Sequence, residues 1–387
     1  MEFNFQKNRK FNIVFLIDGL GMGGAERMMI PILQHLDRDN FSLRVCAFQE
    51  REGNPIANDV LALGIPVDFL PVPYLRDVTA LPRLWNYLRI SKADLVHTQL
   101  EFANTLGNFI AKLLRLPSVC TIHTLSSQVM NIKSRAHHLL EWSSQRWFCD
   151  RVIAVSEEAR IHHMRVSGLT ETKMITIYNG IDTSHFDGME NERDALRREL
   201  GIPLDAHLLT TVAVLREPKG IQFMLRAMSE ILVSNPQTYY LIAGDGPYGS
   251  ALREEAGKLQ QSAHVIFAGM RKDVPRVLAA SDIFVLPTLT EALPTVLAEA
   301  MSCRLPVVAS AVGGVPEMVF NGENGLLVSP GDPRQLASAC LTLLRDMDRS
   351  RKMGEQGWKI VHEKFDVLGQ VDRLKQLYLE LIKQYDR

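Results

Sequence analysis

The chain has 387 residues, 46% hydrophobic and 22% charged, and a formal net charge of −1 at pH 7. This balance excludes a disordered chain and does not indicate a nucleic-acid-binding protein. The length favours two domains of about 180 residues each over a single core. The five cysteines are scattered without a CxxC pair, which indicates neither a zinc site nor a disulfide framework and fits a reducing cytoplasm.

The first apolar run, residues 11–17, is interpreted as a buried strand rather than as part of a signal peptide. It is short, and it ends in a glycine-rich turn at residues 18–24 without a cleavage pattern. A helix is expected from about Ala25, with a kink or a shortened end at Pro31. No stretch of the sequence approaches the ~20 apolar residues that a bilayer span needs.

Strand-like and helix-like segments alternate through the first half of the chain. Strands are expected at 43–48, 67–70, 94–98, 118–123, 152–155 and 174–178, and helices at 55–62, 81–90 and 103–114. This alternation predicts an α/β domain built on a doubly wound parallel sheet. We expect strands to end at His97 and His123, at the carboxyl edge where such sheets bind ligands. A lone histidine is nevertheless more often structural than functional.

Residues 133–151 allow two interpretations. A basic and aromatic helix can lie on an anionic membrane surface. A stripe of apolar residues at helical spacing more often faces a core, and we expect that arrangement here. The basic residues are Lys133, Arg135, Arg146 and Arg151, the aromatic ones are Trp142, Trp147 and Phe148, and the stripe consists of Ala136, Leu139, Leu140 and Trp147.

A turn at residues 179–182, Asn-Gly-Ile-Asp, predicts a domain boundary. The alternation then repeats, with strands expected at 208–214, 239–243 and 265–267 and helices at 221–232, 249–259 and 274–280. After residue 333 the chain is expected to be helical to its end. The second half is therefore predicted to form another α/β domain.

Residues 281–314 combine two strands, a loop and a helix around two carboxylates. The strand 283–286 leads into a loop that carries Glu291, and Pro294 suits the first turn of a helix that extends to residue 303. Glu299, in the second turn, leans back toward the loop because helical side chains tilt toward the N-terminus. The unpaired amides of the first turn favour an anion. Two ordinary surface carboxylates are the alternative interpretation.

Several motifs recur in an order that is typical of one family. They are Gly23-Gly24-Ala25-Glu26-Arg27, Asp94-Leu95-Val96-His97, Thr121-Ile122-His123, Tyr178-Asn179-Gly180-Ile181-Asp182, Lys219-Gly220, Gly244-Asp245-Gly246-Pro247, Glu291-Ala292-Leu293-Pro294 with Glu299-Ala300-Met301, and Gly313-Gly314-Val315-Pro316-Glu317. Over nearly the whole chain they resemble retaining GT-B glycosyltransferases of family 4. The resemblance implies two Rossmann-like doubly wound domains, residues 1–180 and 181–365, that face a central cleft. It also implies a final helix, residues 366–387, that packs back on the first domain.

The resemblance implies roles for individual residues. Glu299 would accept hydrogen bonds from ribose hydroxyls, Glu291 would hold sugar hydroxyls, and Lys219 would neutralise the leaving diphosphate. The expected catalytic residues are His123, Lys219 and Glu291. The other expected donor-side residues are Gly23, Gly24, Arg216, Gly269, Met270, Arg271, Leu293, Pro294, Thr295 and Val296, and the expected acceptor-side residues are His97 and His123.

The sequence departs from the family at two positions. Family members commonly have an arginine five residues before the lysine, where this chain has Val214. Arg216, two residues later, is either its substitute or a solvated residue that pairs with Glu217 or with nothing. The family also often has a histidine two positions after His97, where this chain has Gln99, so a family role for position 99 does not transfer.

The implied reaction is transfer of a sugar from a UDP- or GDP-linked donor to a hydroxyl acceptor, without a cofactor or metal. The expected location is the cytoplasm, with peripheral contact at the inner face of a membrane as a further expectation. The sequence specifies neither the acceptor nor the oligomeric state. A nucleotide-sugar epimerase and an inactive GT-B binding module remain alternatives. A glycoside hydrolase would use two carboxylates without the phosphate-binding parts, and an NAD-dependent oxidoreductase is supported by the glycine-rich turn alone.

Overall fold

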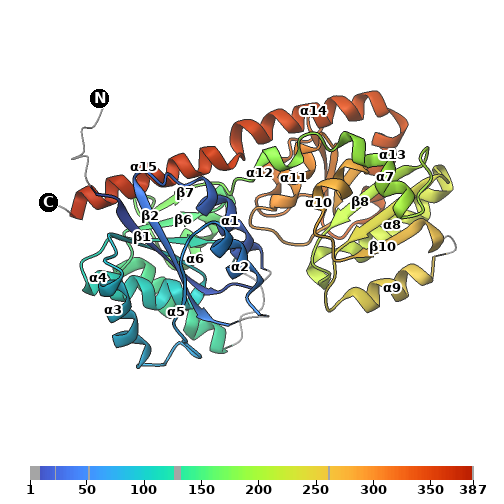
Figure 1. The fold of residues 1–387 in the computed structure, drawn as a ribbon. Coiled ribbons are helices and arrows are strands. Elements are labelled where there is room, and N and C mark those ends of the chain that lie inside the picture. Colours follow the sequence, from blue (N-terminus) through green and yellow to red (C-terminus); the bar gives the residue numbers. More distant parts are fainter. Residues whose placement is uncertain (1–8, 22, 51–52, 126–131, 260–261, 386–387) are drawn as a thin grey trace. The chain divides into compact units, whose positions relative to one another are not determined.

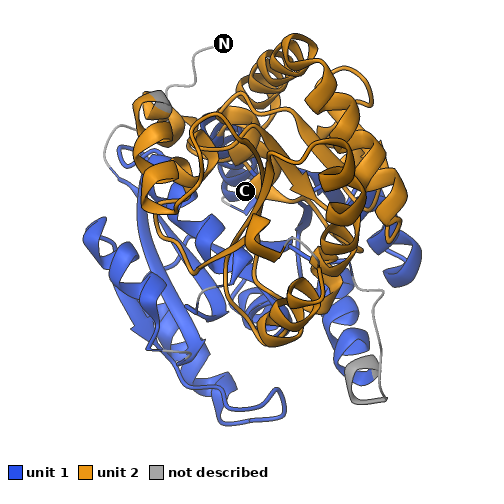
Figure 2. Cartoon of the chain, turned by 90° about the vertical axis from the view of Figure 1, so that its right-hand side faces the viewer, with its two compact units in different colours: residues 1–179, 367–387 blue, residues 180–366 orange. Residues whose placement is uncertain are grey.

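The computed structural model describes residues 9–21, 23–50, 53–125, 132–259 and 262–385. The chain divides into two compact units (Figure 2). Unit 1 comprises Met1–Asn179 and Val367–Arg387, and unit 2 comprises Gly180–Asp366. In each unit helices cover both faces of a parallel sheet (Figure 1). Both units therefore have the α/β architecture that the alternation of segments predicts.

Unit 1 contains a seven-stranded sheet in the order β3-β2-β1-β4-β5-β6-β7. The strands are β1 (Phe11–Gly19), β2 (Phe41–Gln49), β3 (Val67–Phe69), β4 (Leu95–Gln99), β5 (Ser118–Ile122), β6 (Arg151–Ala154) and β7 (Met174–Thr176). Neighbouring strands pair in parallel throughout. The central strands are almost continuously buried, as expected where helices cover both faces.

The helices of unit 1 are α1 (Gly24–His35), α2 (Pro55–Ala62), α3 (Ala80–Ile90), α4 (Asn108–Leu113), α5 (Ile132–Trp147), α6 (Glu157–Ser167) and α15 (Val367–Tyr385), with a π-helical turn at Ala103–Gly107 before α4. The shortening expected at Pro31 is wrong, because α1 continues four residues beyond it. The π-helical turn was not predicted. It is held by Asp18 at the end of β1, whose carboxylate accepts hydrogen bonds from the amides of Phe102 and Ala103.

Unit 2 contains a six-stranded parallel sheet in the order β10-β9-β8-β11-β12-β13. Its strands are β8 (His207–Val212), β9 (Thr238–Ala243), β10 (Val265–Gly269), β11 (Ile283–Leu286), β12 (Val307–Ser310) and β13 (Gly325–Val328). Its α-helices are α7 (Glu192–Glu199), α8 (Ile221–Ser234), α9 (Gly249–Gly257), α10 (Val274–Ala279), α11 (Thr295–Ser302), α12 (Val315–Met318), α13 (Pro333–Arg345) and α14 (Met347–Lys364). This strand order reverses direction between β8 and β11, the switch point where doubly wound sheets bind ligands.

The outer face of α5 contradicts the expectation of a core stripe. Leu139, Leu140 and Trp147 are 60%, 53% and 65% exposed. The inner face of the helix is polar. Its Ser144 hydroxyl donates to the carbonyls of Asn104 and Thr105 in the π-helical turn. The side chains of Lys133 and Arg135 lie outside the described part of the chain.

Helix α15 fastens the carboxyl end of the chain to unit 1 (Figure 1). The buried hydroxyl of Tyr378 lies 2.5 Å from Nδ1 of His97 in β4. Lys375 pairs with Asp37 at 2.6 Å, which lowers the pKa of that carboxyl. Polar contacts thus position α15 on an otherwise apolar interface.

Strand β4 runs to Gln99, one residue beyond the expected range 94–98, and so does not end at His97 as expected. His97 therefore lies inside the strand, 1% exposed, and its Nε2 contacts the hydroxyl of Thr121 at 2.7 Å. Burial lowers the pKa of His97 to about 3. The expectation that His97 ends its strand at the carboxyl edge is wrong: the residue lies inside the strand, and both ring nitrogens contact neighbours in the core.

The Tyr378→Phe substitution is expected to destabilise unit 1 by about 1–3 kcal/mol, because it removes a hydroxyl from a buried imidazole nitrogen. Urea unfolding followed by tryptophan fluorescence measures the effect. Tyr74 is 55% exposed, so Tyr74→Phe is the matched control and should stay within about 0.5 kcal/mol of the wild type. Equal stability of the two variants would show that the His97 contact contributes nothing.

Candidate functional site

The switch point of unit 2 brings two predicted residues into direct contact. Lys219 follows β8, and Glu291 follows β11, its neighbour in the sheet. The Lys219 Nζ lies 2.6 Å from Oε1 of Glu291, and the side chains are 30% and 12% exposed. A cation and a carboxylate therefore meet at the edge where the fold class binds ligands.

Backbone contacts fix the two loops to each other. The amide of Leu289 donates to the carbonyl of Pro218 at 2.8 Å, and the hydroxyl of Thr288 donates to the same oxygen at 3.2 Å. Gly220 has φ +70°, and a Cβ there would lie 1.8 Å from the carbonyl oxygen of Pro287. Only glycine permits this approach, so Lys219 is held beside the loop of Glu291 before any ligand binds.

Helix α11 begins one residue later than predicted. Pro294 is its N-cap in an extended conformation, not a residue of its first turn, and no side chain caps the helix. The first amides, those of Thr295 and Val296, have no acceptor within the helix and can bind an anion. Leu293 is buried at 7% exposure, and Glu299 in the second turn is partly exposed.

The loop after β10 lies on the same edge of the sheet. Gly269 has φ +66°, and Met270 is 63% exposed, which leaves an apolar surface there. Arg271 pairs with Asp273 at 2.6 Å and with Glu199 at 2.7 Å, and both carboxylates raise its pKa. The expectation that the side chain of Arg271 borders a ligand is therefore not supported by its placement. Its contacts instead fasten the loop to α7.

Arg216 lies at the start of the short helical turn that ends at Lys219. It is exposed, and among the described residues its guanidinium makes no ion pair with Glu217 or any other carboxylate. Val214, at the position of the family arginine, is 48% exposed. Both positions can thus present a side chain to the solvent at this edge.

In unit 1 the two predicted glycines differ in their surroundings. A Cβ on Gly23 would lie 2.1 Å from the carboxylate of Glu26, whereas a Cβ on Gly24 would meet nothing within 4 Å. Glu26 is 7% exposed although it belongs to the first turn of α1. A side chain at Gly23, the N-cap of α1, would therefore displace the carboxylate of Glu26, whereas Gly24 has open space beside it.

His123 follows directly after β5, one residue beyond the strand that is expected to end with it, and lies at the carboxyl edge. Its Nε2 lies 3.2 Å from Oε1 of Gln99, which is itself 1% exposed. Burial lowers the pKa of His123 to about 4, so the ring is neutral at pH 7. The imidazole can therefore exchange hydrogen bonds with a ligand, but it is a weak base.

Sequence patterns do not reveal that Gln99 and Glu26 lie beside predicted residues. Gln99 lies just past the strand expected at 94–98. Glu26 stands within a quoted motif, but nothing in the spacing shows that its side chain turns inward. Among the described residues, no three His, Cys, Asp or Glu side chains gather closely enough to hold a metal ion.

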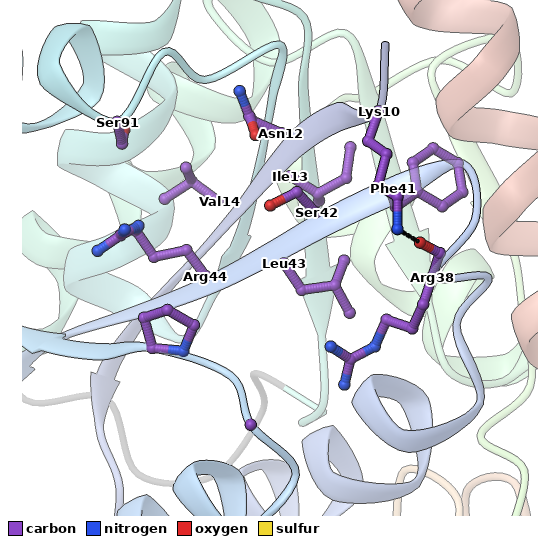
Figure 3. A pocket seen from close by; sticks show the side chains of 12 residues that line it. Lys10, Asn12, Ile13, Val14, Arg38, Phe41, Ser42, Leu43, Arg44 and Ser91 are labelled. Carbon is purple, nitrogen blue, oxygen red and sulfur yellow. Dashed lines mark hydrogen bonds between the residues drawn. The ribbon is translucent and has the colours of Figure 1, made fainter. Parts of the chain in front are cut away.

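A basic hollow lies at the opposite, amino end of the strands in unit 1 (Figure 3). Its cations include Lys10, Arg38 and Arg44. Lys10 donates to the carbonyl of Arg38 at 2.6 Å, and Arg44 pairs with Asp68 at 2.6 Å. None of the predicted residues lines it, and parallel sheets bind ligands at the other edge, so we do not place the site there.

Known proteins match both units. A family model described as "Glycosyltransferase Family 4" matches residues 22–185, and one described as "Glycosyl transferases group 1" matches residues 192–360. The D-inositol 3-phosphate glycosyltransferase of Corynebacterium efficiens is 31% identical over 313 residues, which are 74% of this chain and 71% of that protein. The UDP-Gal:alpha-D-GlcNAc-diphosphoundecaprenol alpha-1,3-galactosyltransferase of Escherichia coli is 25% identical over 372 residues, which are 93% and 95% of the two chains.

Solved structures agree with these matches at the level of the fold. The crystal structure of Anabaena HepE in complex with UDP superposes with a TM-score of 0.87, covers 96% of this chain and all of its own, and is 24% identical. The lipopolysaccharide glycosyltransferase WaaG superposes with a TM-score of 0.75 and is 18% identical. From the two family models and the 31% identical relative, we conclude that the chain belongs to the glycosyltransferases of group 1 and family 4, with two Rossmann-like domains of the GT-B class.

Proposed function

We propose that the protein transfers a sugar from a UDP- or GDP-linked donor to a hydroxyl acceptor, with retention of the anomeric configuration. The observation that carries the proposal is the contact between Lys219 and Glu291 at the switch point of unit 2. A diphosphate attached to a sugar requires a cation for the phosphate and hydrogen-bond acceptors for the hydroxyls, close together. The resemblance of the surrounding motifs to retaining enzymes supports the stereochemistry.

Donor binding is proposed to break the ion pair between Lys219 and Glu291, so that each residue binds a different part of the donor. Lys219 transfers from Glu291 to the diphosphate, where the amides of Thr295 and Val296 add further positive potential. Glu291 then accepts hydrogen bonds from sugar hydroxyls, and Glu299 accepts them from the ribose. Met270, which is 63% exposed at the end of β10, offers an apolar surface for the base.

In the reaction the acceptor oxygen forms a bond to the anomeric carbon while the bond from that carbon to the phosphate oxygen breaks. The acceptor proton passes to the departing phosphate, so no protein base is needed. Lys219 stabilises the charge that develops on the diphosphate. We propose Arg216 as the second cation, because it is exposed on the same loop and its charge is not neutralised by a neighbouring carboxylate among the described residues. No metal is assigned a role.

The acceptor is proposed to be presented at the cytoplasmic face of a membrane. The Escherichia coli relative is named for an acceptor linked to diphosphoundecaprenol, which is a lipid carrier. Within the described ranges no helix combines the length and apolar character needed to cross a bilayer. We propose that contact with the membrane is peripheral.

The outer face of α5 is the proposed contact surface. It consists of Leu139, Leu140, Arg146 and Trp147, and the guanidinium of Arg146 lies 5.3 Å from the ring of Trp147. Glu141, the one acidic residue of α5, instead accepts inward hydrogen bonds from the side chains of Asn104 and Gln145. Apolar side chains beside a cation, without an acid, suit an anionic lipid surface.

The transferase activity itself can be tested without an acceptor. With EDTA present, one sugar from a panel of UDP- and GDP-sugars is expected to be released slowly, together with the free nucleoside diphosphate. An isomerised but intact nucleotide sugar would indicate an epimerase, and no binding or turnover across the panel would indicate an inert module.

Glu299→Ala should weaken binding of the free nucleoside diphosphate by about 1.5–3 kcal/mol in calorimetry, because charge-assisted hydrogen bonds to ribose are lost.

Glu291→Gln is expected to bind the free nucleoside diphosphate about two- to five-fold more tightly, because Lys219 no longer has to leave a carboxylate. The advantage of the nucleotide sugar over the free nucleotide should shrink in the same variant. Glu254→Gln breaks an exposed ion pair between Glu254 in α9 and Lys258, the residue just after that helix, and serves as the control, with unchanged affinity expected. Weaker binding of the free nucleotide by Glu291→Gln would contradict the exchange of partners.

Replacing Leu139, Leu140 and Trp147 together by serine is expected to reduce binding to phosphatidylglycerol vesicles by at least about ten-fold, since buried apolar area is lost at the bilayer surface. Vesicle sedimentation measures the effect, and donor hydrolysis should be unchanged. Val233→Ser removes an 82% exposed side chain from α8 in unit 2 and should leave vesicle binding intact. Equal binding by the triple variant and the wild type would rule out this face.

A further inference from the structure

Two polar pairs repeat along the same face of β4 and β5. The strands align His97 with Val119 and Gln99 with Thr121. His97 and Gln99 each contact the residue two positions beyond their partner on β5: His97 contacts Thr121 at 2.7 Å, and Gln99 contacts His123 at 3.2 Å. The first pair is in the core, whereas the second lies at the carboxyl edge.

Gln99 is well placed to control the ring of His123. It is 1% exposed, so its side chain has little freedom, and its Oε1 points to Nε2 of the ring. No other hydrogen bond of His123 occurs within the described residues, and the ring is partly exposed. The bond to one ring nitrogen determines which nitrogen carries the proton and which can accept.

We propose that Gln99 is a positioning residue that holds His123 in the neutral tautomer protonated at Nε2, so that Nδ1 accepts a hydrogen bond from a hydroxyl of a bound sugar. The proposal rests on the proposed function, because it takes a sugar to bind beside His123. Gln99 itself touches no reacting atom.

The surroundings of His123 favour a neutral acceptor. Burial lowers the pKa of His123 to about 4, and the titratable neighbour that couples to it, His97, is also neutral at pH 7 because burial lowers its pKa to about 3. A glutamine does not titrate, so its carbonyl accepts from the ring at every pH in the working range. The ring would therefore present the same acceptor across neutral pH.

The tautomer can be observed without any activity. In the full chain labelled with ¹⁵N-histidine, two-bond ¹⁵N–¹H correlations distinguish the two neutral tautomers, and His123→Asn identifies the signals of His123 among the eleven histidines. The wild type is expected to show the Nε2–H form, and Gln99→Leu a mixture. A wild-type ring protonated at Nδ1, or an unchanged tautomer in Gln99→Leu, would overturn the proposal.

A second experiment places a negative charge beside the ring of His123. Gln99→Glu places a carboxylate beside the ring and raises the pKa of His123, because a nearby negative charge favours the protonated form. A nearby opposite charge shifts a pKa by about 1–3 units, and a protonated ring cannot accept at Nδ1. Between pH 8.5 and pH 5 kcat/KM for sugar release should therefore fall at least about two-fold in Gln99→Glu, whereas the wild type, with a pKa of about 4, should lose only about a tenth. A flat profile in Gln99→Glu would also overturn the proposal.

A matched pair elsewhere in unit 1 provides the control. Gln145 Oε1 lies 2.8 Å from Nε2 of the buried His163, between α5 and α6. Gln145→Leu is expected to change the His163 signals and to leave sugar release unchanged. Loss of activity in this control as well would mean that breaking any such pair damages the fold, and would remove the kinetic support. If the wild type releases no sugar from any donor, the proposed function fails, but the tautomer measurement still tests the role of Gln99.

Discussion

The contact between the loops after β8 and β11 is the constraint on which the site depends. Gly220 permits it by a backbone conformation that other residues rarely adopt, and the carbonyl of Pro218 accepts two hydrogen bonds from the second loop. Because these loops follow neighbouring strands on either side of the switch point, their alignment comes directly from the order of the sheet. Lys219 and Glu291 then meet without a ligand, and the start of α11 lies just beyond Glu291 in the same loop.

The two units differ in the charge of the polar residues at the carboxyl edges of their sheets. In unit 2 the site is ionic and partly exposed, which suits a diphosphate that brings its own charge. In unit 1 the residues at the carboxyl edge of β4 and β5 are neutral and mostly buried, since desolvation disfavours the charged imidazole. Neutral groups of this kind can discriminate hydroxyls by hydrogen bonds. The proposed roles agree with these two environments: Lys219 binds the diphosphate, the Glu291 carboxylate accepts from sugar hydroxyls, and the neutral ring of His123 accepts from a hydroxyl without adding charge.

Much of this could be predicted from the sequence, because apolar runs separated by helical segments determine an α/β fold and short motifs locate the loops. The errors have physical causes. Periodicity showed the stripe on α5 but not which way it faces, and buried partners of Ser144 and Glu141 turn the apolar side outward. Strand β4 extends to Gln99, so His97 lies inside the strand, and Gln99, for which the motifs give no role, lies beside His123 at the edge. The ion pairs of Arg271 join residues distant in sequence, and spacing alone does not reveal them.

The most direct test of the account is a crystal structure of the protein with a bound nucleoside diphosphate, compared with the ligand-free protein. The central claim is that the cation held by Glu291 is the one that neutralises the phosphate. The predicted result is that Lys219 Nζ leaves the carboxylate and lies within hydrogen-bond distance of a phosphate oxygen, with the amides at the start of α11 facing the same group. A bound diphosphate with Lys219 still paired to Glu291, or a diphosphate bound away from these two loops, would contradict the account.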